Sequence, residues 1–217
     1  MSTFSRFLKF MTKPLVVVIC LLTIILCILY VDKPLAEFLN SMNLRTNFSF
    51  LNWFTKLGLG IVYFVLLFIA ALFFRYVRKN RLWEERMWFL WLSVIVPSTI
   101  CVFLKVMLGR ARPSLWFESK YYGFFGLQYH APYWSFPSGH TTTIMGLALG
   151  LCVIFPRYCY TFLITGFLVA ASRVLLTHHY LSDVLTASYI TFLEVGLLLW
   201  VLEKKSWLRL AWKDAIK

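Results

Sequence analysis

The feature that most constrains this chain is a series of six long apolar segments separated by short polar stretches. They cover residues 14–31, 57–74, 87–108, 140–155, 158–176 and 184–202. A membrane-spanning helix needs about 20 mostly apolar residues, with roughly 17 to 25 tolerated, and these segments come close to that length. Pro97 lies inside the third segment and predicts a kink there. We therefore expect an all-α polytopic membrane protein with six transmembrane helices, folded as a single domain over residues 1–217.

Composition favours a membrane protein over a soluble one. Of the 217 residues, 60% are hydrophobic and only 14% are charged. The net charge of +13 does not indicate a nucleic-acid partner, because the basic residues lie in short stretches between apolar segments. The five cysteines show no paired metal-type spacing, so they are interpreted as packing residues. We expect neither a disulfide framework nor a bound metal.

The distribution of lysine and arginine predicts the orientation in the membrane. Six spans place both termini on one side, and that side carries 14 Lys and Arg residues against 7 on the other. Because cytoplasmic loops are enriched in these residues, we expect cytoplasmic termini in a plasma membrane, such as a bacterial inner membrane. The first segment follows basic residues, as a signal peptide does, but no small-residue cleavage site precedes Asp32. It is therefore interpreted as an uncleaved anchor.

Ionisable residues gather where three predicted spans reach the outer face. The third span ends in K-V-M-L-G-R-A-R-P at 105–113, the fourth begins at P-S-G-H at 137–140, and S-R-V-L-L-T-H-H-Y-L-S-D at 172–183 joins the last two. Charged groups beside hydrocarbon are costly and usually functional. The periplasmic or extracellular end of the bundle is thus the predicted site.

The residue types in these stretches match a tetrahedral oxyanion, and phosphate fits them best. Lys105, Arg112 and Arg173 supply three cations, and an arginine grips two oxygens at once. Ser138 adds a hydroxyl, and Gly139 adds a backbone amide at a helix start, where the helix dipole favours an anion.

Two residues in the last stretch have the spacing of a nucleophile and its orienting acid. His179 and Asp183 are four apart, so the carboxylate reaches one imidazole nitrogen if the last span begins near Tyr180. The other nitrogen then stays free to attack. His178 points elsewhere, and it and His130 are interpreted as non-catalytic.

These stretches resemble the three motifs of type 2 phosphatidic acid phosphatases (PAP2), which share their phosphate site with vanadium haloperoxidases and bacterial acid phosphatases. K-x6-R-P matches 105–113, P-S-G-H matches 137–140, and S-R-x5-H-x3-D matches 172–183. The resemblance implies a helical-bundle core of PAP2/haloperoxidase type and metal-free chemistry without a cofactor. The membrane-spanning form favours a lipid phosphatase over vanadate-dependent halide oxidation.

The resemblance also implies roles for individual residues. His179 would attack phosphorus and become a phosphohistidine, with Asp183 orienting it, and His140 would protonate the leaving group and then activate water. The oxygens of the five-coordinate transition state would be held by Lys105, Arg112, Ser138, Gly139 and Arg173.

A long outer loop, residues 109–138, joins the first two motifs and carries ten aromatic residues between Ser114 and Phe136. One interpretation is an aromatic belt at the depth of the lipid headgroups. The other is a partly inserted flap that receives a lipid tail, with Trp116, Phe117, Phe124, Phe125 and Trp134 as contacts. Glu194, about 16 Å deeper than Asp183 along one helix, is expected to meet a structural partner on a facing helix, with substrate selection as the alternative.

Three functions fit the sequence. The first is a membrane phosphatase for a lipid phosphate or diphosphate, and the second is a phosphotransferase that passes the same phosphohistidine to a lipid acceptor. The third is a non-enzymatic transporter, which predicts charges spread through the spans rather than gathered at one end. The motifs do not separate phosphatidate, phosphatidylglycerophosphate, polyprenyl diphosphate or a lipid A phosphate as substrate, nor do they predict an oligomeric state.

Overall fold

The computed structural model describes residues 3–212, which are helical throughout apart from loops and one isolated bridge between Arg110 and Phe124. The α-helices are α1 (Thr3–Met11), α2 (Pro14–Leu26), α3 (Asp32–Ser41), α4 (Leu44–Asn47), α5 (Ser49–Phe54), α6 (Gly60–Tyr76), α7 (Arg81–Leu108), α8 (Pro113–Ser119), α9 (Gly139–Ile154), α10 (Cys159–Leu175) and α11 (Leu181–Lys204). A π-helix, η1 (Cys27–Val31), and the 3-10 turns η2 (Thr55–Gly58), η3 (Ala131–Tyr133) and η4 (Pro156–Tyr158) connect them.

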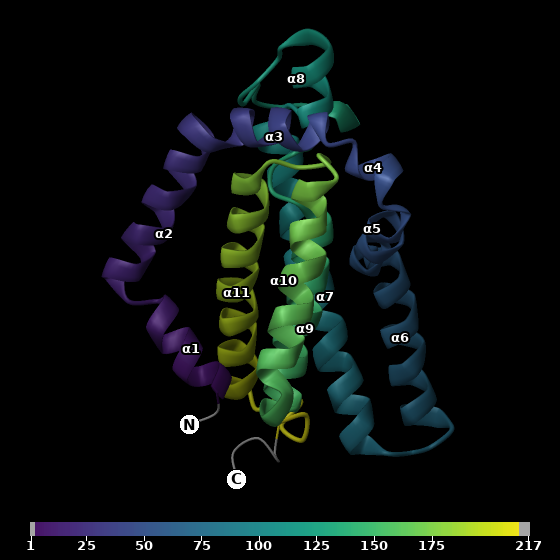
Figure 1. Cartoon of the computed structure of the whole chain (residues 1–217). Coiled ribbons are helices and arrows are strands. Elements are labelled where there is room, and N and C mark those ends of the chain that lie inside the picture. Colours follow the sequence, from purple (N-terminus) through teal and green to yellow (C-terminus); the bar gives the residue numbers. More distant parts are fainter. Residues whose placement is uncertain (1–2, 213–217) are drawn as a thin grey trace.

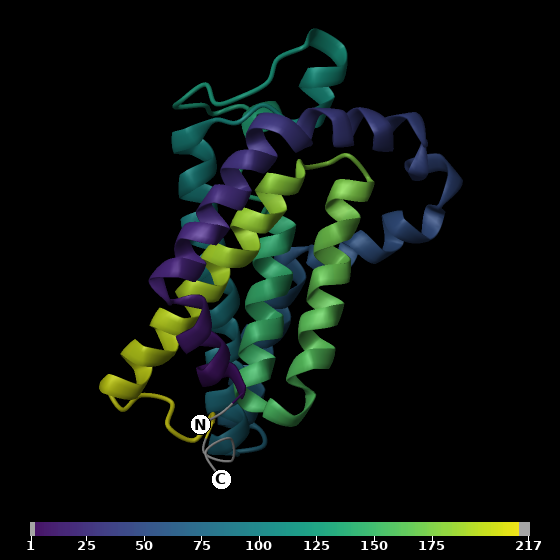
Figure 2. The same cartoon turned by 60° about the vertical axis from the view of Figure 1, so that its left-hand side comes forward.

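Helix α9 forms the centre of the bundle, because it packs against α7, α10 and α11. Helix α6 lies alongside α7. Helix α2 is inclined away from the other helices in Figure 1, but it contacts α11, over which it lies in Figure 2. Figure 1 shows α3 crossing one end of the bundle beneath the loop that contains α8, while both termini lie at the other end. The expectation of an all-helical protein is confirmed.

Four helices are long and apolar enough to cross a membrane, namely Pro14–Ser41, Arg81–Leu108, Pro156–Leu175 and Leu181–Lys204. A fifth span results if the helical pair Ser49–Gly58 and Gly60–Tyr76, bent by 47°, counts as one. The remaining predicted span corresponds to α9, whose 16 residues fall short of that length. The described residues therefore provide four or five candidate spans, with the shorter α9 enclosed among them.

Pro97 lies within α7 but does not end it. Proline has no N–H, so it leaves the carbonyl of Ser93 without its usual intrahelical donor. Helix α9 approaches that carbonyl closely, since a Cβ atom added to Gly146 would lie 2.3 Å from the oxygen of Ser93. A glycine at this position therefore permits the close contact between α7 and the central helix.

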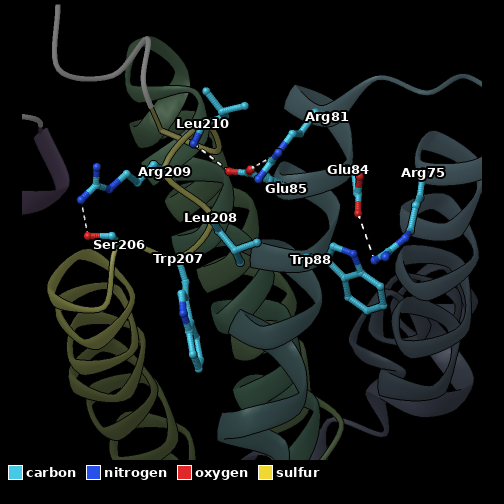
Figure 3. Close-up of a pocket in the computed structure, with 10 residues that line it drawn as sticks. All are labelled: Arg75, Arg81, Glu84, Glu85, Trp88, Ser206, Trp207, Leu208, Arg209 and Leu210. Carbon is cyan, nitrogen blue, oxygen red and sulfur yellow. Dashed lines mark hydrogen bonds and ion pairs between the residues drawn. The ribbon is translucent and has the colours of Figure 1, made fainter.

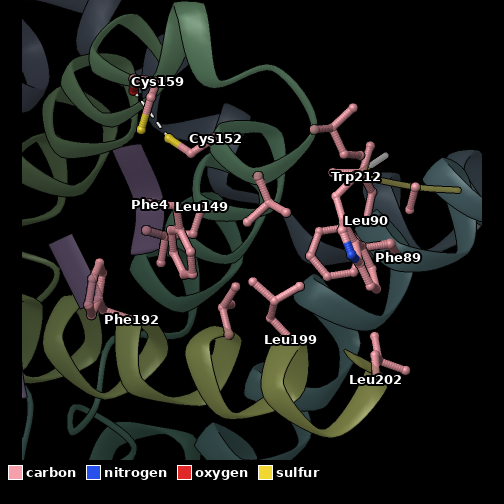
Figure 4. Packing of buried hydrophobic residues seen from close by; sticks show 14 residues of the cluster. Phe4, Phe89, Leu90, Leu149, Cys152, Cys159, Phe192, Leu199, Leu202 and Trp212 are labelled. Carbon is pink, nitrogen blue, oxygen red and sulfur yellow. Dashed lines mark hydrogen bonds between the residues drawn. The ribbon is translucent and has the colours of Figure 1, made fainter. Parts of the chain in front are cut away.

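The main hydrophobic core, drawn in Figure 4, includes Phe4 and Trp212 from near the two ends of the described chain. Phe4 of α1 packs on Phe192 of α11, with ring centroids 5.6 Å apart. Phe89 of α7 meets Trp212 edge-on at 5.3 Å. These apolar contacts close one end of the bundle, so the buried polar groups described next are concentrated at the other.

Candidate active site

The three predicted motifs meet at the end of the bundle that lies beneath the α8 loop (Figure 1). Lys105 lies in the last turn of α7, Arg173 in the last turn of α10, and Asp183 in the first turn of α11. Helix α9 begins at Gly139 with Ser138 as its N-cap residue, as expected. Residues up to 78 positions apart in the chain are thereby brought to one place.

Lys105 is buried against the amino end of α9. Its Nζ donates to the carbonyl oxygen of Trp134 at 2.7 Å. A Cβ atom on Gly139 would lie only 3.5 Å from Cε of the lysine. The lysine ammonium and the first amides of α9 therefore converge on the same space, which is the arrangement an anion requires.

Two arginines approach this space with donors that the protein leaves unused. Arg173 is buried, and its Nη1 donates to Oγ1 of Thr55 in η2 at 2.9 Å. The Nε atoms of both Arg112 and Arg173 are buried without a hydrogen-bond partner among residues 3–212. Burial lowers the pKa of Arg112, which lies outside the spans. Orphaned guanidinium donors are costly, and a phosphate oxygen would satisfy them.

His179 is almost fully buried in the loop between α10 and α11. Its Nδ1 lies 2.7 Å from the carbonyl oxygen of Ser135 and 3.6 Å from Oδ2 of Asp183. Burial lowers the pKa of His179 well below its usual value, although Asp183 opposes the effect. The imidazole is therefore neutral near pH 7. The carboxylate of Asp183 approaches one imidazole nitrogen, as the spacing of four predicts, but the carbonyl oxygen of Ser135 lies nearer to that nitrogen.

The carboxylate of Asp183 is fixed by several donors. Its Oδ2 accepts from the hydroxyl of Ser135 at 2.6 Å and from the N–H of Tyr180, the N-cap residue of α11, at 2.9 Å. Its Oδ1 accepts from Arg110 at 2.5 Å. Because Ser135 donates its hydroxyl to Asp183 and faces His179 with its carbonyl, it joins the two predicted catalytic residues.

Arg110 and Asp32 belong to this site, and sequence reasoning missed both. Nη2 of Arg110 lies 2.7 Å from Oδ2 of Asp32, and neither side chain is exposed. The K-x6-R-P run does contain a second arginine, but the motif itself marks only Arg112. A lone carboxylate at the edge of an apolar segment was the other available signal.

His140 is half-buried and packs against η2. A Cβ atom on Gly58 would lie 2.8 Å from Cβ of His140, so only glycine permits this contact. The imidazole interacts electrostatically with Arg173, Lys105 and Arg112. The bent connection before α6 is thus a wall of the site, which the sequence did not indicate.

The aromatic loop is folded rather than extended. The indole N–H of Trp116 donates to Glu37 at 2.9 Å, and that of Trp134 donates to the carbonyl of Gln128 at 2.9 Å. Phe117 is half-buried, whereas Phe124 and Phe125 are 44% and 42% exposed. Two of the five predicted lipid contacts thus present their rings outward.

Three other residues that the sequence singles out have surroundings of their own. Oε2 of Glu194 is buried and has no hydrogen-bond partner within the described part of the chain, so the expected partner on a facing helix is not found. Arg45 donates to Nδ1 of His178 at 3.2 Å, which ties that histidine to α4. His130 is exposed in the outer loop.

A hollow of about 840 Å³ lies at the opposite end of the bundle (Figure 3). Its acidic side chains are already paired, since Glu84 meets Arg75 at 3.5 Å and Glu85 meets Arg81 at 3.1 Å. It contains none of the motif residues. No group of three or more His, Cys, Asp or Glu side chains in residues 3–212 is arranged to hold a metal ion.

Comparison with known proteins identifies the family of this chain. A model described as the PAP2 superfamily matches residues 86–207, which include all three motifs. The chain belongs to the PAP2 superfamily. Its relatives include a lipid A 1-phosphatase of Rhizobium etli, 33% identical over 97 residues, and one of Rhizobium johnstonii, 32% identical over 97 residues. Each match covers 45% of this chain but only 42% and 40% of the relatives, so less than half of either is spanned. No solved structure gives a significant match.

Two residues that contact the candidate site lie outside the range that matches the PAP2 superfamily model. Asp32 and Thr55, which contact Arg110 and Arg173, precede residue 86. In this PAP2 protein the segment before α6 therefore completes a site whose motif residues all come later in the chain.

Proposed function

We propose that this protein is an integral-membrane phosphatase that hydrolyses the phosphate ester or diphosphate of a lipid through a phosphohistidine on His179. The observation that carries the proposal is the state of that imidazole. It is buried and neutral, and its Nδ1 is held by a carbonyl oxygen 2.7 Å away. A carbonyl only accepts, so Nδ1 bears the proton and Nε2 keeps the lone pair needed for attack.

The proposed first step transfers the phosphoryl group to the protein. Nε2 of His179 forms a bond to phosphorus as the bond from phosphorus to the lipid oxygen breaks. His140 donates a proton to that leaving oxygen. Lys105, Arg112 and Arg173, with the amides at the start of α9, stabilise the charge on the equatorial oxygens.

The second step releases phosphate. Water attacks phosphorus, His140 accepts the proton from that water, and the bond between phosphorus and Nε2 breaks. The products are inorganic phosphate and free His179. Three cations balance the charge of the phosphoryl group, so the proposed chemistry requires no metal.

The proposal includes six spans, with cytoplasmic termini and the site at the outer face. Helix α9 supports the sixth span despite its length, because most of its residues are buried against α7, α10 and α11 and few need to meet lipid. The bias of 14 to 7 Lys and Arg residues supports the orientation.

Among the candidate substrates, we favour a lipid A 1-phosphate, because the two Rhizobium relatives are lipid A 1-phosphatases. The test is release of phosphate by purified protein from lipid A, phosphatidate, phosphatidylglycerophosphate and polyprenyl diphosphate. Each reaction is run with and without an unphosphorylated lipid acceptor. Release of free phosphate supports hydrolysis. A phosphorylated acceptor would show that the protein is a phosphotransferase instead. If no lipid yields either product, the proposal is contradicted.

A further inference from the structure

A buried ion cluster lies directly behind the predicted catalytic carboxylate. Arg110 is fully buried, and its two terminal nitrogens bind different carboxylates. Nη1 lies 2.5 Å from Oδ1 of Asp183, and Nη2 lies 2.7 Å from Oδ2 of Asp32. Arginine suits this position because its planar fork holds two acceptors in fixed directions. One cation thus joins the start of α11 to the start of α3.

Ser182 closes the cluster into a ring. Its hydroxyl accepts from Nη1 of Arg110 at 2.6 Å and donates to Oδ2 of Asp32. Its backbone N–H donates to Oδ1 of Asp32 at 3.1 Å. Asp32 therefore binds the first turn of α11 both directly and through Arg110.

The cluster is sealed from water by aromatic rings. The guanidinium of Arg110 lies 4.7 Å from the ring centroid of Tyr180, 5.2 Å from Phe124 and 5.5 Å from Tyr122. Burial would lower the pKa of Arg110, but Asp183 and Asp32 outweigh it and raise the pKa above its usual value. The cation is therefore permanent, and its attraction for the carboxylates is strengthened by the low local polarity.

Stability alone is a poor explanation for such a cluster. Desolvation of buried charges often cancels their attraction, and apolar residues of similar volume frequently stabilise as well or better. Both terminal nitrogens of Arg110 donate to protein groups, namely Asp183, Asp32, Ser182 and Tyr122, and only its buried Nε has no partner among the described residues. The guanidinium of Arg173, by contrast, donates within the described residues from Nη1 alone, to Oγ1 of Thr55.

What the cluster does control is the direction of one carboxylate. Arg110 holds Oδ1 of Asp183, which leaves Oδ2 for the hydroxyl of Ser135 and, at 3.6 Å, for Nδ1 of His179. Turning Asp183 would release Ser135, and the carbonyl of Ser135 is the group that lies 2.7 Å from His179. The orientation of the imidazole therefore depends on Arg110 through two intermediate residues.

We propose that Arg110 and Asp32 are positioning residues for phosphoryl transfer, which hold Asp183, and through it Ser135 and His179, in the reactive geometry. Neither touches the phosphate. The inference rests on the proposed phosphohistidine mechanism, and it makes the segment before α6 part of the catalytic apparatus.

The test compares full-length purified variants in one detergent, with dioctanoyl phosphatidate as substrate. Arg110→Gln should lower kcat at least tenfold and leave KM within twofold, because a positioning residue acts on the reacting geometry rather than on phosphate binding. Arg110→Lys keeps the charge and should give a kcat at least threefold above that of Arg110→Gln. The matched control is Arg86→Gln, which removes another buried arginine of α7, one that donates to the carbonyl of Ala211 at the opposite end. Its kcat should stay within twofold of wild type.

Two results would overturn the inference. One is a kcat of Arg110→Gln equal to that of Arg86→Gln, and the other is a raised KM with unchanged kcat, which would make Arg110 a phosphate ligand. If Arg110→Gln does not fold, the positioning inference is tested with Asp32→Asn instead. Glu37→Gln, in the same helix, is the control for that variant. A threefold or greater loss of kcat in Asp32→Asn alone supports positioning, and equal activity of the two variants refutes it.

His179→Ala is measured in the same assay. If it stays active, the phosphohistidine mechanism fails, whereas if it is inactive and the Arg110 and Asp32 variants are normal, only the positioning inference fails.

Discussion

Nδ1 of His179 lies 2.7 Å from the carbonyl oxygen of Ser135, a residue 44 positions earlier in the chain. This contact fixes both the tautomer and the plane of the imidazole. It directs the unprotonated Nε2 away from the backbone, and every prediction about turnover depends on that direction.

Replacing the three clustered histidines should separate their roles. His179→Ala should lower kcat by at least about 10³-fold, because no other nucleophile takes the place of Nε2. His140→Ala should lower it by about 10² to 10⁴-fold, the usual contribution of acid–base assistance. His178→Ala should stay close to wild type. Phosphate release by the purified, folded variants is the measurement, and full activity in His179→Ala would disprove the assignment.

Orthovanadate should inhibit the enzyme without added metal. Vanadate adopts the five-coordinate geometry that Lys105, Arg112 and Arg173 are proposed to stabilise in the transition state. EDTA should leave activity largely intact. An initial rate that EDTA abolishes and Mg²⁺ or Zn²⁺ restores would contradict the proposed metal-free chemistry.

The loop aromatics should affect long-chain substrates more than short ones. Phe125 is 42% exposed and lies edge-on to Tyr133, so its outer face is free for a lipid chain. Phe125→Ser should lower kcat/KM for a long-chain lipid phosphate about tenfold, or about 1.4 kcal/mol, and change a short-chain analogue little. Tyr129→Ser, at a 69% exposed position of the same loop, is the control. Equal losses on both substrates would instead make Phe125 a structural support.

Cysteine labelling can test the orientation of the site. Lys120 and Lys79 both have positive φ, 59° and 47°, and both side chains are exposed. Cysteines at these two positions therefore have similar backbone conformations and similar exposure. On a background without the five native cysteines, Lys120→Cys should react with an impermeant reagent in intact cells. Lys79→Cys should react only after lysis. The reverse pattern would place the candidate site in the cytoplasm.

Acidification should destabilise the protein partly through His178. Burial, with Arg173 and Arg45 nearby, lowers the pKa of His178 to about 3. An unfolded histidine binds a proton below about pH 6.5, whereas the folded one stays neutral until about pH 3, so stability falls as the pH drops through this window. The melting temperature of His178→Gln should therefore decrease less than that of wild type between pH 6.5 and 4.5. Parallel decreases would show that His178 is not the group responsible.

The sequence predicted the helical class, because long apolar runs indicate the spans. It also predicted that Lys105, Arg173 and Asp183 gather at one end, because successive spans run in opposite directions and the order of the spans determines which of their ends lie together. The predicted fourth span, residues 140–155, corresponds to α9, but the 16 residues of this helix are fewer than a full span needs. That helix is short because its neighbours, rather than lipid, surround it. Hydropathy alone does not distinguish these two environments.

The sequence could not predict which groups hold His179 and Asp183. A spacing of four predicts a contact between them, but the backbone of Ser135 and the guanidinium of Arg110 arrive from a loop whose path no periodicity describes. Asp32 is more remote still, since its partners lie 78 and 150 positions away. Such contacts depend on tertiary packing rather than on local pattern.

The ring formed by Asp32, Arg110 and Ser182 also has a consequence for biogenesis. Ribosomes deliver the chain from its amino end, so Asp32 is made 150 residues before the serine that it binds. Until α11 is inserted, the carboxylate and the guanidinium lack their last partners. The proposed catalytic centre can therefore form only when α11 enters the membrane, and we expect a chain stalled before that point to be inactive whatever motifs it already carried.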